Sequence, residues 1–561
     1  MRTPLAVRMC RLLSTPVRWE ASRQVRRWRE AVRDTRRTQA ALLARLLADA
    51  AQTDFGRDAG LDGARTAADL RACLPIAGYE RAAPYVERVT RGEVQALFPA
   101  GTRVHMFAMT SGTTGRAKYI PVTGTGLRNY RAGWHIWGAL ALNDHRDAFG
   151  ARILQISSRV EEETMPCGLP AGAISGLAAQ GQRRLIRRLY VSPPACAHAR
   201  DTISKYYLVC RLGLQCDRVM PITANPSTLL GLARTMDRRK EDLLRDLSDG
   251  TLADDVAIDG QARRAIERRL RACPDRARRL DRLAEANGRL HPRDVWEVPL
   301  IGTWKGGTLS LYLANMPQYW GEAPIRDIGL IASEGRFSIP VQTSGSAGVL
   351  ETTATFYEFV PEDEIHNKHP TALLAHEVEP GQRYFLIVTT AGGLFRYHMG
   401  DLVEVTGRAG EAPLIAFLNK GEHVANLTGE KITEHHVIAA VNHVVAERGL
   451  SLAGYCLCPT WDDVPYYSLL VEADDVPAET APQVAAAVDA ALAHRNMEYE
   501  AKRGSGRLRP IRIKTLPAGT WEAYDREMIA RRSGRVEQYK HKFLEPEVDF
   551  EQRFQILAEY A

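Results

Sequence analysis

Short apolar runs alternate with longer amphipathic segments along most of this chain. Residues 20–50 and 226–290 repeat their apolar side chains at the spacing of a helix. Four apolar runs have the length of buried strands: 151–158, 295–304, 383–390 and 401–407. Because such strands and helices are interleaved, the sequence predicts an α/β architecture.

Length and a change of pattern together predict two domains. A chain of 561 residues is longer than a single hydrophobic core usually supports. Near residue 420 the pattern changes to shorter alternating elements, at 426–449, 466–473, 481–495 and 509–517. We therefore expect a large N-terminal domain over 1–419 and a small α+β domain over 420–561.

Composition excludes several classes of protein. Nine cysteines occur without a C-x-x-C pair, which argues against a disulfide framework or a zinc site and favours a reducing compartment. No run of about 18 apolar residues is present, and the basic N-terminus lacks a continuous apolar region, so we expect a cytoplasmic protein with no membrane partner. The arginine-rich run at 261–273 has the pattern of an amphipathic helix, and the net charge is only +7, so no nucleic-acid partner is expected.

A polar loop punctuated by glycine separates two apolar runs in FAMTSGTTGRAKYIPVT, at 107–123. Its central residues are all small and precede the basic Lys118: Thr110, Ser111, Gly112, Thr113, Thr114 and Gly115. Such a loop can wrap its backbone N–H groups around an anion, because glycine permits positive φ and has no Cβ. The spacing does not match the P-loop motif G-x-x-x-x-G-K-[ST]. From the residues alone, the loop is equally compatible with a phosphate cradle and with a solvated turn.

Two later stretches suit a nucleotide as well. Ser333, Glu334 and Gly335 follow a short apolar run, so Glu334 is expected at a strand end, where it can hold Mg²⁺ or lie exposed in a turn. Arg396 and Asp401 bracket an expected turn between two strands. Asp401 can accept hydrogen bonds from ribose hydroxyls, or it can satisfy the N–H groups of the turn.

A further stretch, LTGEKITE at 427–434, follows the expected domain junction. Its Lys431 can serve a nucleotide site, and the same residues also read as a helix N-terminus with Glu434 in the first turn. Taken in order, the four stretches resemble the motifs of the acyl-adenylate-forming superfamily, which includes acyl-CoA synthetases and luciferases.

The resemblance is closest to the auxin-responsive Gretchen Hagen family of acyl acid amido synthetases. It is carried by TSGTTGRAKYIPVT, ASEG, TFYEFVPEDE, LIVTTAGGLFRYHMGDLVEVTG and LTGEKITE, and it covers nearly the whole chain. Plant members commonly have Y-R-Y-R-V-G-D in the third motif, whereas Phe395 and His398 stand here in place of the first tyrosine and the second arginine. The stretch WKGGTLSLYLANMPQYWG at 304–321 begins with Trp304 but otherwise is similar to bacterial relatives, and the alanine and arginine bias of the chain agrees, so we expect a bacterial-type member.

The resemblance implies a reaction in two halves, with ATP and Mg²⁺ as cofactors. A carboxylic acid attacks the α-phosphate of ATP to give acyl-AMP and pyrophosphate, and an amine, usually an amino acid, then displaces AMP. It also implies a large domain with mixed sheets flanked by helices, a small mobile C-terminal domain and a monomer. Transfer to a thiol of coenzyme A or a carrier protein, and a non-catalytic nucleotide-binding protein, are the alternatives.

The resemblance also implies roles for particular residues. Thr110 to Gly115 would hold the β- and γ-phosphates, assisted by Lys118, and Arg396 would lie near the phosphates. Ser333, Glu334 and Gly335 would lie by the adenine, with Glu334 as the magnesium ligand, and Asp401 would bind the ribose. In the small domain, Lys420 would occupy the hinge, and Lys540 or Lys431 would assist adenylation.

Overall fold

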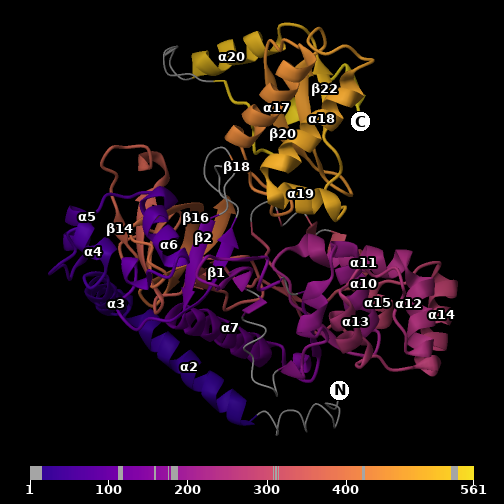
Figure 1. Ribbon diagram of the computed structural model, residues 1–561, viewed down its shortest axis with the longest axis horizontal. Coiled ribbons are helices and arrows are strands. Elements are labelled where there is room, and N and C mark those ends of the chain that lie inside the picture. Colours follow the sequence, from indigo (N-terminus) through magenta and orange to yellow (C-terminus); the bar gives the residue numbers. More distant parts are fainter. Residues whose placement is uncertain are drawn as a thin grey trace. The chain divides into compact units, whose positions relative to one another are not determined.

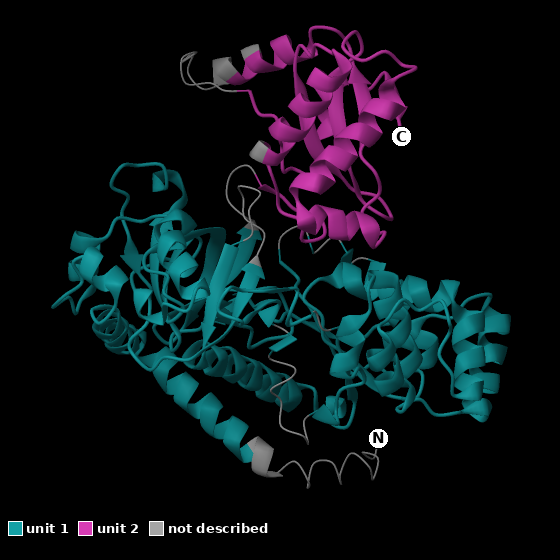
Figure 2. Ribbon diagram, in the orientation of Figure 1, with its two compact units in different colours: residues 1–110, 118–419 teal, residues 111–117, 420–561 magenta. Residues whose placement is uncertain are grey.

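The computed structural model describes residues 15–110, 118–156, 159–174, 176–177, 187–306, 309, 312–313, 315–419, 424–531 and 541–561. The chain forms two compact units, drawn in teal and magenta in Figure 2. Unit 1 comprises residues 1–110 and 118–419, and unit 2 comprises residues 111–117 and 420–561. Each unit combines β-sheets with helices.

The largest sheet of unit 1 has seven strands in the order β11-β12-β17-β16-β15-β13-β14, and each neighbouring pair is antiparallel. Its strands are β11 (Ser338–Ile339), β12 (Gly348–Leu350), β13 (Thr355–Pro361), β14 (Leu373–Leu374), β15 (Arg383–Thr390), β16 (Tyr397–Ala409) and β17 (Ala412–Asn419). The expected strand at 383–390 is confirmed as β15, which is buried beyond its first residue because nearly all its side chains are apolar.

A second sheet of unit 1 has the order β2-β1-β5-β4 and carries both arms of the glycine-rich loop. Its strands are β1 (Val104–Thr110), β2 (Lys118–Thr123), β4 (Glu163–Thr164) and β5 (Pro170–Gly172). Three two-stranded ladders are also present: β3 (Arg152–Leu154) with β6 (Val219–Pro221), β7 (Ile301–Gly302) with β8 (Ile325–Arg326), and β9 (Ile331–Ala332) with β10 (Gly335–Arg336).

Helices pack around these sheets, and α10 to α15 gather in one group (Figure 1). They are α2 (Thr15–Arg33), α3 (Thr35–Ala50), α4 (Asp54–Asp58), α5 (Ala67–Cys73), α6 (Ala83–Thr90), α7 (Gly124–Asp144), α10 (Thr202–Gly213), α11 (Pro226–Arg238), α12 (Lys240–Asp249), α13 (Gly260–Glu267), α14 (Pro274–Asn287), α15 (Pro292–Val295) and α16 (Met316–Trp320). The helical pattern at 20–50 divides into α2 and α3 because Asp34 caps α3, accepting from the Arg37 N–H at 3.2 Å. None of the helices in the described parts of the chain is long and apolar enough to cross a membrane.

The apolar run at 295–304 is not the single strand that its composition predicts. Helix α15 ends at Val295, and only Ile301–Gly302 forms a strand. The side chain of Trp296 is buried and donates to the Gly213 carbonyl at 3.0 Å. The prediction is wrong because an apolar run indicates burial rather than a strand, and Pro299 has no N–H to give to a ladder.

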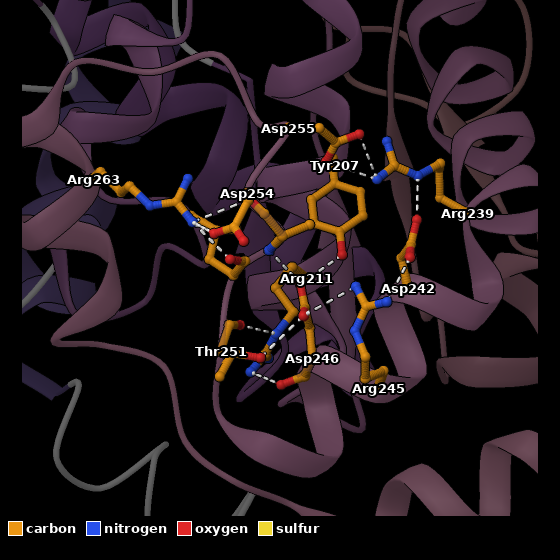
Figure 3. A network of polar contacts seen from close by, with 12 residues as sticks. Tyr207, Arg211, Arg239, Asp242, Arg245, Asp246, Thr251, Asp254, Asp255 and Arg263 are labelled. Carbon is orange, nitrogen blue, oxygen red and sulfur yellow. Dashed lines mark hydrogen bonds and ion pairs between the residues drawn. The ribbon is translucent and has the colours of Figure 1, made fainter.

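A polar network joins α10 to the helices that follow it (Figure 3). The Asp246 carboxylate accepts from the Tyr207 hydroxyl at 2.6 Å, and the buried Arg211 donates to the Asp246 carbonyl at 2.6 Å. In the arginine-rich run, Arg263 pairs with Glu267 at 2.9 Å. These arginines therefore bind neighbouring acids and carbonyl groups and stabilise the helical group.

Unit 2 has a four-stranded sheet in the order β20-β21-β22-β23, parallel between β21 and β22 and antiparallel elsewhere. Its elements are β18 (Val424–Ala425), β19 (Ile432–Thr433), α17 (Glu434–Arg448), β20 (Tyr455–Thr460), β21 (Tyr466–Glu472), α18 (Ala481–Arg495), α19 (Met497–Gly504), β22 (Arg512–Leu516), α20 (Thr520–Arg531) and β23 (Ala558–Tyr560). Apolar side chains of α17, α18 and the sheet form a core of its own. The alternating elements expected at 466–473, 481–495 and 509–517 correspond to β21, α18 and β22.

Candidate active site

The two arms of the glycine-rich loop meet at its base. β1 ends at Thr110 and β2 begins at Lys118, and these residues are direct partners in an antiparallel ladder. The chain thus leaves this sheet and returns to it at one place. The loop residues Ser111 to Gly115 lie outside the described part of the chain, as do Lys420 and Lys540.

Tyr79 holds the first residues of β2. Its hydroxyl donates to the Tyr119 carbonyl at 2.8 Å, and the Tyr119 N–H donates to that hydroxyl at 3.1 Å. Lys118 Nζ lies 5.6 Å from the centre of the Tyr79 ring, within reach of a cation–π interaction. Tyr79 therefore fixes the backbone next to Lys118 and also supports its ammonium group.

The segment that carries Tyr79 also contacts the start of β16. Ala77 forms a parallel bridge with Tyr397. The Ala77 N–H donates to the Arg396 carbonyl at 3.2 Å, and the His398 N–H donates to the Ala77 carbonyl at 2.9 Å. Residues 77–79 therefore connect the first residues of β2 to the first residues of β16.

Glu334 lies in the turn of the hairpin formed by β9 and β10. The Tyr397 hydroxyl donates a long hydrogen bond to Glu334 Oε1, at 3.5 Å. Burial, together with the nearby carboxylates of Glu334 and Asp401, raises the pKa of Tyr397. Burial and the Glu334 carboxylate also raise the pKa of Tyr79 to about 12, against a lowering by the hydrogen bond with the Tyr119 backbone. The structure thus brings Glu334 and Asp401 together around Tyr397, with Tyr79 alongside.

Asp401 lies inside β16, and the expectation that it ends a turn is wrong. The ladder with β15 shifts register between His398 and Leu402, so β16 bulges there. Gly400 lies in this bulge at a φ of 80°, which favours glycine. A bulge redirects a side chain without ending the strand. Because bulges and turns both favour glycine, Gly400 suggested a turn in the sequence although the strand continues through it.

Arg396 makes its contacts within unit 1. Its Nε and Nη2 donate to the two Glu358 carboxylate oxygens at 2.8 and 3.1 Å, and its Nη1 donates to the Leu74 carbonyl at 2.7 Å. Both charged side chains are buried, with 7% of Arg396 and 1% of Glu358 exposed. All three guanidinium nitrogens are therefore bound to protein groups, which favours a structural role over the expected contact with phosphate.

In unit 2, a buried carboxylate shapes the turn that carries Lys431. Glu430 accepts from two backbone N–H groups at 2.6 and 2.7 Å and from the Tyr467 hydroxyl. Lys431 has a φ of 48°, and its Nζ lies 3.6 Å from a Glu498 oxygen, with about a third of the side chain exposed. The backbone at Lys431 is thus fixed while its ammonium group stays accessible.

The donor groups around Glu334 suit Mg²⁺ only when a nucleotide supplies further ligands. Among the residues that the structure describes, no group of three or more His, Cys, Asp or Glu side chains could hold a metal ion. Mg²⁺ that arrives with a nucleotide needs only one or two carboxylates, because phosphates and water supply its other ligands. The partly exposed Glu334 fits that requirement.

Three family domains match this chain in succession. Residues 24–325 match the GH3 family N-terminal domain, 348–420 the GH3 family central domain and 435–547 the GH3 family C-terminal domain. The chain belongs to the GH3 family. This is the Gretchen Hagen family that the motifs resemble, and its amido synthetases are adenylate-forming ligases that use ATP.

Individual GH3 relatives extend over most of the chain. The probable indole-3-acetic acid-amido synthetase GH3.1 of Oryza sativa subsp. japonica is 26% identical, over 90% of this chain and 86% of its own. The jasmonoyl–L-amino acid synthetase JAR4 of Nicotiana attenuata is 22% identical, over 73% of each chain. A solved GH3.15 acyl acid amido synthetase, 20% identical over 95% of both chains, has a TM-score of 0.64. The structure of AtGH3.15 with 2,4-DB has a TM-score of 0.66 at 18% identity, over 96% of this chain and 97% of that one. These structures confirm the α/β GH3 fold.

The sequence motifs of this GH3 protein gave no indication that Tyr79 and Tyr397 belong to the site. Tyr397 stands inside the third motif directly after Arg396, and its own side chain carries no charge. Tyr79 lies in IAGYE at 76–80, which has no charge pattern or glycine spacing of a nucleotide site. Its role depends on pairing with two distant strands, which only the fold provides.

Replacing Tyr79 with phenylalanine should raise the KM for ATP in acid-dependent ATP–pyrophosphate exchange by about 10-fold. The variant loses two hydrogen bonds to Tyr119, each worth roughly 0.5–1.5 kcal/mol, and keeps the ring beside Lys118. Tyr79→Leu also removes the ring and should lower kcat/KM further. The matched control is Tyr85→Phe, which removes a hydroxyl bound to Asp58 at 2.7 Å and should leave the KM for ATP unchanged. An unaltered KM in both Tyr79 variants would exclude the positioning role.

Proposed function

We propose that this chain is an ATP-dependent acyl acid amido synthetase that activates a carboxylic acid as acyl-AMP and transfers the acyl group to an amino acid. One observation carries the proposal: Lys118, Glu334 and Asp401, which come from three separate motifs, gather around Tyr79 and Tyr397. A cation and two carboxylates at one place suit a magnesium nucleotide, because they bind phosphate, metal and ribose respectively.

The proposed chemistry consists of two displacements. An oxygen of the acid attacks the α-phosphorus as the bond to pyrophosphate breaks, and the amine nitrogen then attacks the acyl carbon as AMP leaves and a proton is lost. Glu334 would hold Mg²⁺, which would supply positive charge that offsets the charge of the phosphates. Lys118 binds the β- and γ-phosphates with the loop before it, and Asp401 fixes the ribose. Such reactions are accelerated mainly by positioning and charge.

We assign the ATP and acyl sites to residues 1–419, and a mobile role in the second half-reaction to residues 420–561. Lys420 is the proposed hinge, and Lys431 or Lys540 the lysine that assists adenylation. Lys431 is supported by its fixed backbone and partly exposed ammonium group. We further propose a cytoplasmic monomer. We assign it to a bacterial-type branch on the basis of residues 304–321 and the alanine and arginine bias of the chain.

The proposal is tested by trapping the activated acid. Enzyme, ATP, Mg²⁺ and hydroxylamine are incubated with a panel of carboxylic acids that begins with indole-3-acetic and jasmonic acids, which the relatives' names suggest. We expect an acyl hydroxamate and stoichiometric pyrophosphate for the preferred acid, read by mass spectrometry. Amino acids and coenzyme A are then offered in place of hydroxylamine. Formation of thioester alone would overturn the amide assignment, and absence of pyrophosphate with every acid would overturn adenylation.

A further inference from the structure

A buried arginine, Arg336, stands in β10 two residues after Glu334, and its side chain packs against helix α7. Only 3% of the Arg336 side chain is exposed. Its guanidinium carbon lies 4.5 Å from the centre of the Trp134 ring. A Cβ at Gly133 would come within 2.3 Å of Arg336 Cδ, so the arginine reaches this position only because residue 133 is glycine. Helix α7 continues directly from β2, the strand that begins at Lys118.

Arg336 uses one of its three nitrogens for hydrogen bonding. Nη1 donates to the Ile328 carbonyl at 2.9 Å and, more weakly, to the Ser338 carbonyl at 3.4 Å. Nε and Nη2 are shielded from solvent and have no hydrogen-bonding partner among the described residues. Arg396, by contrast, binds protein groups with all three nitrogens.

The nearest acidic side chains do not form an ion pair with Arg336 within the part of the chain that the structure describes. Asp327 instead accepts from the Gly329 and Lys305 N–H groups, at 2.6 and 2.7 Å. Glu351 accepts from the Ala354 N–H at 2.9 Å and from Thr353. Both carboxylates attract the arginine only from a distance. Burial lowers the pKa of Arg336 to about 10, which leaves it charged at neutral pH.

The two nitrogens without partners form one edge of the planar guanidinium. Nε–H and one Nη2–H point the same way, and such an edge matches the two oxygens of a carboxylate. A buried cationic donor without a partner is unfavourable, so a ligand group that binds this edge gains more than it would at a solvated arginine. Trp134 covers one face of the guanidinium, which suits the carbon chain that would carry such a group.

We propose that Arg336 determines the choice of acid by binding a second carboxylate, so that the preferred substrates are dicarboxylic acids. This inference rests on the proposed function, because it places the acid between the Glu334 hairpin and helix α7. One carboxyl group would be activated near Glu334, and the other would form a bidentate pair with Nε and Nη2 of Arg336. Since the edge is shielded in this structure, binding requires that the side chains covering it shift.

The test compares acids that differ only in the second charge. For each chain length, the kcat/KM for hydroxamate formation is measured with a dicarboxylic acid and with its monomethyl ester. We expect the wild-type enzyme to prefer the dicarboxylic acid by about 10-fold or more. In Arg336→Met and in Arg336→Lys, which keeps the charge without the bidentate edge, this ratio should fall toward one. The control Arg128→Met, at an exposed position of helix α7, should keep the ratio.

A structural role of Arg336 would give a different result. Both acids would then lose activity together and their ratio would stay constant, which would overturn the proposal, as would a wild-type enzyme that does not distinguish the two. Binding of the same acids is also measured by calorimetry without ATP. If no acid yields hydroxamate but Arg336→Met abolishes a calorimetric preference for the dicarboxylic acid, the proposed function fails while the inference about Arg336 stands. If Arg336→Met does not fold, Arg336→Lys still tests the proposal, because lysine retains a positive charge over Trp134.

Discussion

Replacing Glu334 with glutamine should lower acid-dependent ATP–pyrophosphate exchange by about 100-fold. A charge-assisted contact of this kind contributes roughly 1.5–3 kcal/mol, and each 1.36 kcal/mol corresponds to a factor of ten in rate. The glutamine has nearly the same shape, and its amide oxygen can still accept from the Tyr397 hydroxyl. The variant therefore removes the negative charge with little effect on the surrounding packing. The measurement is exchange of labelled pyrophosphate into ATP at saturating acid, repeated over a range of Mg²⁺ concentrations.

The dependence of the exchange rate on Mg²⁺ distinguishes two roles of Glu334: a ligand of the metal, and a residue that only shapes the β9–β10 turn. If Glu334 binds the metal, the Glu334→Gln variant should need a higher Mg²⁺ concentration for half-maximal exchange. The matched control is Glu379→Gln, an exposed position of the same unit, which should leave both the rate and the Mg²⁺ dependence unchanged. Exchange that is normal in rate and in Mg²⁺ dependence after Glu334→Gln would remove Glu334 from the site.

The neighbourhoods of Lys118 and Glu334 could be predicted, because each stands beside a short strand in a motif with small residues. The place of Asp401 could not, because it lies in a bulge inside β16 rather than at a turn. Small residues and charges at strand ends are local features, so the sequence shows them directly. The same local reading predicted β15, α18 and β21. It failed for the run at 295–304, where burial came from tryptophan packing rather than from a ladder.

Contacts between distant segments could not be predicted in the same way. Tyr79 binds Tyr119 and lies near Tyr397 because Ala77, two residues earlier, pairs with the start of β16. Arg396 and Asp401 stand in one motif, but their surroundings differ. Arg396 binds Glu358 of β13, whereas Asp401 lies near Tyr397. One signal was available: Glu358 is a charge within the apolar strand TFYEFVP, and a buried carboxylate generally requires a buried cation.

Removing one member of the Arg396–Glu358 pair should destabilise unit 1 by about 3–5 kcal/mol. In Glu358→Met, Arg396 would stay buried without a carboxylate. In Arg396→Met, Glu358 would keep its ion pair with Arg71, whose side chain is about one third exposed and whose Nε lies 2.8 Å from it. Glu358→Met should therefore have the larger effect. The double variant should be less destabilised than either single variant, because two apolar side chains of similar volume can replace a buried ion pair. The measurement is urea denaturation followed by tryptophan fluorescence.

The exposed pair between Arg383 and Glu362 provides the control on the same sheet. Its atoms are 3.7 Å apart, and about half of each side chain is exposed. Glu362→Met should change the unfolding free energy by less than about 1 kcal/mol, because solvent screens such a pair. If Glu358→Met were as mild as this control, the guanidinium of Arg396 would have to reach solvent or another acceptor. Its bidentate contact would then not be what holds the turn before β16 beside residues 77–79, and the phosphate contact expected from the motif would regain support.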